Sequence, residues 1–96
     1  MSNYEELDLE QLEQISGGST APINTGDDQN AGIWARWESI GVRKADDSLK
    51  NGTMVHIIGA PRYHEGKHRN YVEIAYTHKG KMKKGWVAAS IVGLKR

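Results

Sequence analysis

Short runs of alternating apolar residues, separated by glycine or charged turns, occupy the chain from Ile33 onward. The clearest runs are residues 53–58 and 71–76. A spacing of two places every second side chain on the same face of an extended strand. Eleven glycines against two prolines supply many turns. The pattern predicts an all-β domain over residues 33–96, a small, partly open barrel of five to six short strands.

Alternation also assigns the two faces of the strand at residues 71–76. Val72, Ile74 and Tyr76 share one face, so we expect them in the core. Tyr71 lies on the other face and is expected to point outward.

Polar stretches separate the expected strands. Residues 62–70 are predicted to form a polar loop and residues 79–84 a basic turn. The pair Asp46 and Asp47 is typical of a turn, and residues 88–90 favour one helical turn.

Charge divides the 96-residue chain in two, although its net charge is only +1. Residues 1–18 carry five acids and no lysine or arginine, and thus −5. The rest holds all thirteen basic residues and seven acids, and thus +6. Such a boundary usually separates segments with different roles.

The acidic segment has the pattern of a short amphipathic helix that stops at Gly17 and Gly18. Its apolar side chains fall within one arc: Tyr4, Leu7, Leu12 and Ile15. A helix this short is marginal alone in water, so we expect disorder or marginal helicity until a partner groove receives the apolar face. It lacks the basic start and continuous apolar core of a general secretory signal.

The segment "EELDLEQLEQISGG" resembles the double-glycine leaders of bacteriocins and other secreted bacterial peptides. The resemblance implies that a peptidase-containing ABC exporter recognises the four apolar residues and cuts after Gly18 during export. Gln11 departs from the glutamate common in that family. The alternative is an uncleaved helix docked on the domain, with the two glycines as its C-cap.

Residues 19–32, "STAPINTGDDQNAG", are small, polar and without periodicity. This composition predicts a flexible linker between the leader and the domain.

The remainder is similar to the bacterial SH3 (SH3b) domain in the order and spacing of four stretches. These are "IGVRKADDS", "LKNGTMVHI", "YVEIAY" and "GKMKKGWVAASIVGL". The closing Gly85-Trp86-Val87 is the most specific of these motifs. The resemblance implies an SH3-like barrel and a groove for cell-wall peptides, carried by Tyr63, Tyr71 and Trp86. Tyr71 stands where the family usually has tryptophan.

Residues for catalysis are sparse. The chain has no cysteine, which excludes thiol chemistry, disulfides and thiolate metal sites. His64 and His68 are four apart, but Gly66 argues against the helix that would bring them onto one face, so solvated loop histidines are favoured over a metal site. No nucleophile with an activating base stands out. We expect no enzyme activity, no cofactor and no metal.

A basic cluster follows the strand at residues 71–76: Lys79, Lys81, Lys83 and Lys84. Lysines of this kind either keep a sheet edge soluble or attract the chain to an anionic surface. Nucleic acid is a weak candidate partner, because no aromatic residues interleave the lysines as stacking platforms.

The sequence therefore predicts a secreted, monomeric, non-catalytic binding module, bacteriocin-like in its leader, whose barrel binds a cell-wall or envelope component. No apolar stretch is long enough to span a membrane. The alternative is an intracellular protein-interaction domain with an uncleaved amphipathic helix.

Overall fold

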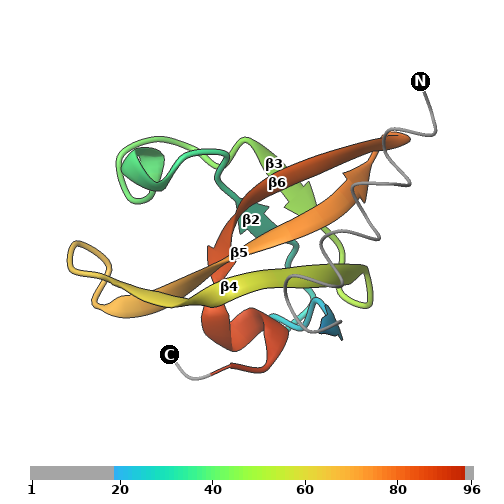
Figure 1. Ribbon diagram of the computed structural model, residues 1–96, viewed down its shortest axis with the longest axis horizontal. Coiled ribbons are helices and arrows are strands. Elements are labelled where there is room, and N and C mark those ends of the chain that lie inside the picture. The colour runs from blue at the N-terminus through green and yellow to red at the C-terminus, as the bar shows by residue number, and fades with distance from the viewer. Residues whose placement is uncertain (1–18, 95–96) are drawn as a thin grey trace.

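The computed structural model describes residues 19–94, which form a mostly β structure (Figure 1). Its strands are β1 (Thr20–Pro22), β2 (Ala31–Ile33), β3 (Asp47–Leu49), β4 (Met54–His64), β5 (Arg69–His78) and β6 (Lys81–Ala88). Two short 3-10 helices, η1 (Trp37–Ser39) and η2 (Ala89–Val92), complete the described elements. The predicted all-β class is confirmed, but only β3 to β6 lie wholly within residues 33–96, where five to six strands were predicted.

The strands form two antiparallel sheets. The larger has the order β1-β4-β5-β6, and its centre is a meander in which β5 pairs with both neighbours. The smaller pairs β2 with β3 and lies beside β6 (Figure 1). Trp34 and Trp86 join the two sheets through reciprocal backbone hydrogen bonds of 3.0 and 2.6 Å. Within residues 19–94 the strands do not close into one continuous barrel.

The main core lies between the sheets. Val72, Ile74 and Tyr76 point into it from one face of β5, as alternation predicts, and each is at most 3% exposed. Val87 on β6 and Ile33 on β2 belong to the same core and are fully buried. Burial of these apolar side chains holds the two sheets together.

Residues 19–32 are part of the fold, which corrects the prediction of a flexible linker. Thr20–Pro22 pairs with β4, and Ile23 is 1% exposed in the core. The Ile23 amide donates to the carbonyl of Thr53, and its own carbonyl accepts from the Gly52 amide. Three strand residues are too few to show a period of two, so the long-range pairing left no pattern in the sequence.

Residues 62–70 also differ from the predicted loop. Strand β4 continues through Gly59-Ala60-Pro61, where the register with β5 shifts between Ile58 and Arg62. Gly59 has φ +90°, which is typical of a bulge that only glycine enters without strain. Charged and exposed side chains beyond the bulge hide the strand from a search for apolar alternation.

The predicted basic turn over residues 79–84 is shorter than expected. Lys79 and Gly80 have φ of 53° and 78°, the left-handed pair that a tight hairpin requires. Strand β6 then begins at Lys81. The predicted helical turn near residues 88–90 is present as η2.

Candidate binding surface

Aromatic rings gather where the ends of several strands meet. Trp34 follows β2, Trp37 lies on η1, Tyr71 lies near the start of β5 and Trp86 near the end of β6. We call these four residues the tryptophan cluster. The His64 ring, from the end of β4, packs beside them.

Trp37 is the centre of the tryptophan cluster. Its ring centroid lies 4.8 Å from that of Trp86, at an interplanar angle of 71°. Tyr71 stands edge-on to it, at 6.5 Å and 87°, and the His64 ring lies at 5.1 Å. Edge-to-face contacts of this kind are favourable and fix the rings relative to one another. Trp37 remains half-buried, so it is held rigidly and still reaches the surface.

A cation lies on the exposed side of this centre. The Arg62 guanidinium carbon is 4.1 Å from the centroid of the Trp37 ring, within the range of a cation–π contact. Arg62 and His64 lie two apart on β4, so alternation turns both side chains toward Trp37. The surface therefore joins an apolar ring to a positive charge.

The loop that carries Trp37 is fastened at both sides. The Trp34 indole Nε1 donates to the Arg43 carbonyl at 2.9 Å, and Asp46 Oδ2 accepts from the Ala35 amide at 2.8 Å. Ile40 from the same loop is 1% exposed against Tyr71. These contacts position η1 over the start of β5.

Tyr71 is buried, which corrects the prediction that it points outward. It is 2% exposed, between the tryptophan cluster and Ile40. Burial raises the pKa of its hydroxyl, and the nearby Arg69 partly opposes this shift. Alternation placed Tyr71 on the correct face of β5. It could not reveal that η1 and its loop cover that face as well.

The other two predicted ligand residues lie in different places. Trp86 is half-buried in the tryptophan cluster, whereas Tyr63 is 55% exposed on β4. Tyr63 is adjacent to Arg62, so alternation directs it away from Trp37. Trp37, Arg62 and His64 were missed as site residues. The only sequence feature that could have indicated them is the spacing of two between Arg62 and His64, and it lies in a stretch predicted to be a loop.

The two histidines of the β4–β5 hairpin have different surroundings. His64 Nδ1 accepts from the Lys67 amide at 3.1 Å, while His68 lies in the β4–β5 turn with φ 55°. Among residues 19–94, no three histidine, aspartate or glutamate side chains come together in a way that could hold a metal ion.

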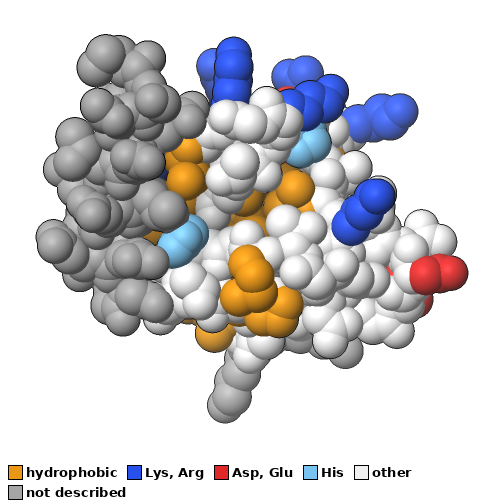
Figure 2. Space-filling view, turned by 90° about the vertical axis from the view of Figure 1, so that its right-hand side faces the viewer, with side chains coloured by type: hydrophobic (Ala, Val, Ile, Leu, Met, Phe, Trp, Pro, Cys, Tyr) orange, Lys and Arg blue, Asp and Glu red, His pale blue; other side chains and the backbone are white. Residues whose placement is uncertain are grey.

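The four lysines of the basic cluster do not share one environment. Lys83 lies with Nζ 2.7 Å from Asp47 Oδ2, which also accepts from the Tyr76 hydroxyl at 2.7 Å. Lys79, Lys81 and Lys84 are exposed around the β5–β6 hairpin. Figure 2 shows cationic side chains spaced along one margin of this side of the molecule rather than gathered in one patch.

Asp47 anchors β3 to the hairpin, which corrects its interpretation as a turn residue. The hydrogen bonds from Lys83 and Tyr76 lower the pKa of its carboxyl, against a smaller opposing effect of burial. Burial, followed by the bond to Asp47, raises the pKa of Tyr76, so its hydroxyl stays a donor. The His78 ring nitrogen Nε2 approaches Asp47 Oδ1 at 3.6 Å.

The predicted leader residues lie outside the described residues: Tyr4, Leu7, Leu12, Ile15, Gly17 and Gly18. No helix within residues 19–94 has the length and apolar character to cross a bilayer. No protein-family model matches the chain, and no match was found among curated proteins or solved structures.

Proposed function

We propose that this protein is an exported, non-catalytic binding module whose SH3b-like domain binds a peptide component of the bacterial cell wall. The observation that carries the proposal is the half-buried Trp37 ring, braced by Trp86 and Tyr71, with the Arg62 guanidinium 4.1 Å from its centroid. A rigid aromatic ring at the surface gives contact area to a ligand without losing much conformational freedom.

The parts of this surface have distinct roles in the proposal. Trp37 and Trp86 pack against the apolar and backbone atoms of an extended peptide. Arg62 supplies an exposed positive charge for an acidic or carbonyl group of the ligand. Exposed lysines of the β5–β6 hairpin add a weaker, salt-dependent attraction to anionic wall polymers.

Export in this proposal depends on residues 1–18. The acidic segment, its spaced apolar residues and the Gly17-Gly18 pair support recognition by a peptidase-containing ABC exporter. Glycine suits the cleavage position because a narrow protease cleft admits backbone that carries no side chain.

Leader cleavage is tested by incubating the full chain with the peptidase domain of the cognate exporter and measuring intact mass. We expect a single product that begins at Ser19, and no product from a Gly18→Trp variant. An uncleaved wild-type chain would contradict export by this route and favour the alternative of an intracellular interaction domain.

Wall binding is tested by sedimenting the full chain with purified bacterial cell wall, with cellulose particles as the control polymer. We expect the protein in the wall pellet, at low and at high salt, and in the supernatant with cellulose. Equal recovery with both polymers, or loss of all binding at high salt, would contradict a specific peptide site.

A further inference from the structure

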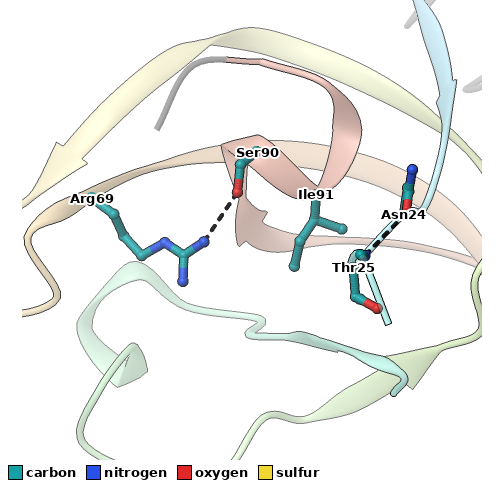
Figure 3. A pocket seen from close by; sticks show the side chains of 6 residues that line it. Asn24, Thr25, Arg69, Ser90 and Ile91 are labelled. Carbon is teal, nitrogen blue, oxygen red and sulfur yellow. Dashed lines mark hydrogen bonds between the residues drawn. The ribbon is translucent and has the colours of Figure 1, made fainter. Parts of the chain in front are cut away.

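An open hollow lies between Arg69 and the turn at residues 24–26. It has a volume of about 460 Å³. Figure 3 shows Arg69 on one side of the hollow and Asn24 and Thr25 on the other, with Ser90 and Ile91 of η2 between them. Among its lining residues only Arg69 carries a charge.

Arg69 is held in place by neutral groups. Its Nη2 atom donates to Ser90 Oγ at 3.1 Å, and its guanidinium carbon lies 5.9 Å from the Tyr71 ring centroid. Arginine stays protonated and carries five N–H donors. No carboxylate of residues 19–94 forms an ion pair with this guanidinium.

One N–H donor of this guanidinium also lacks a hydrogen-bond acceptor among the described residues. Arg69 Nε is buried and makes no hydrogen bond to any described residue. Buried donors are normally satisfied, and the charge of this half-buried arginine has no carboxylate partner among residues 19–94. An arginine in this state, beside an open hollow, is suited to an anionic ligand.

The opposite wall is already formed. The backbone amide of Asn24 donates a hydrogen bond to the Ile91 carbonyl at 2.8 Å, and this bond connects the turn to η2. Asn24 Oδ1 accepts from the Gly26 amide at 3.0 Å, and the Thr25 amide donates to Asn51 Oδ1 at 2.8 Å. A wall fixed in this way need not be ordered when a ligand binds.

We propose that this hollow binds a carboxylate at the end of a peptide whose other atoms contact the tryptophan cluster. The inference rests on the proposed function and assigns a second subsite to it. Tyr71 connects the hollow with the tryptophan cluster, because its ring contacts both Trp37 and Arg69. Ile91 likewise lines the hollow and packs against the cluster. A single arginine among neutral polar groups matches the single charge of a carboxylate better than a phosphate dianion.

The test uses NMR of the full chain, with the side-chain Nε–H signal of Arg69 as the readout. N-acetylglycine is the probe, and N-acetylglycinamide is its uncharged match. We expect a saturable shift of the Arg69 signal with N-acetylglycine and none with the amide. Arg69→Gln should weaken the binding at least tenfold, as read from the Gly26 and Ile91 amides. Arg43→Gln, which removes an exposed arginine that does not line the hollow, should leave the binding unchanged.

Equal shifts with both probes, or none with either, would overturn the carboxylate site. Tighter binding of inorganic phosphate than of N-acetylglycine would also overturn it. The wild-type comparison does not depend on variants, so it decides the matter even if Arg69→Gln fails to fold. A chain that responds to N-acetylglycine but does not sediment with cell wall supports this site and contradicts the proposed function. A chain that sediments without this response contradicts the site alone.

Discussion

Among single residues, alternation predicted which face of β5 points into the main core, but not that the opposite face is buried as well. Val72, Ile74 and Tyr76 are buried as their spacing predicts. Tyr71 and Ala75, on the other face of β5, are buried as well. A period of two reports which side chains share a face, and it carries no information on what covers that face. Hydrogen-bond partners distant in sequence, such as Asp47 for the Tyr76 hydroxyl, could not be predicted from alternation either.

Asp47 gives the fold a measurable dependence on acid. Lys83 and Tyr76 lower the pKa of its carboxyl in the folded state, so its ionised form stabilises the fold above the ordinary aspartate pKa of about 4. This contribution is lost as pH falls through the lowered folded pKa. Asp47→Asn should therefore be less stable than wild type at pH 6, and the gap should narrow below about pH 4.

Urea unfolding at several pH values measures this gap in the free energy of unfolding. Asp28→Asn is the matched control, because Asp28 is exposed and its replacement removes the same charge. We expect the control to differ little from wild type throughout. A gap for Asp47→Asn that stays constant between about pH 6 and pH 3 would show that the carboxyl does not act through its charge.

At the scale of elements, close contact between β2 and β6 brings the tryptophan cluster together. Gly85 makes this approach possible, since a Cβ there would lie 2.6 Å from Ile33 Cγ2 and 3.0 Å from the Trp34 carbonyl oxygen. Trp34 and Trp86 pair immediately beside it. The Gly85-Trp86-Val87 motif, identified from its resemblance, thus has a packing role in this fold. The hairpin β4–β5 was harder to predict because its outer half is charged.

Gly85→Ala should force β2 away from β6. We expect a loss of about 1–3 kcal/mol in the free energy of unfolding, typical of overpacking against backbone. Lys84→Ala, an exposed neighbour on the same strand, should change stability by less than about 0.5 kcal/mol. Amide hydrogen exchange of Trp34 and Trp86 locates the effect, and unchanged protection of both in Gly85→Ala would contradict this account.

At the scale of the whole molecule, the class of fold was predictable and its extent was not. Glycine turns and short apolar runs sufficed for the all-β class, but β1 and most of β2 lie in the segment predicted to be a linker. The contribution of residues 19–32 rests on backbone pairing of β1 and on one buried isoleucine, neither of which makes a pattern. The candidate binding surface was predicted only in part. Trp86 was named from its motif, whereas Trp37 and Arg62 meet only because η1 folds back over β5.

We propose that Trp37 and its neighbours form the binding surface of the domain. The most direct measurement compares the affinity of wild type, Trp37→Ala and Tyr63→Ala full chains for purified cell wall by sedimentation, after NMR has shown that each variant is folded. Trp37→Ala should weaken binding at least about tenfold, because it removes the centre of the cluster. Tyr63→Ala, which removes an exposed ring directed away from Trp37, should alter it by about twofold or less. A folded Trp37→Ala chain that binds the wall as tightly as wild type would show that the tryptophan cluster is not the binding surface.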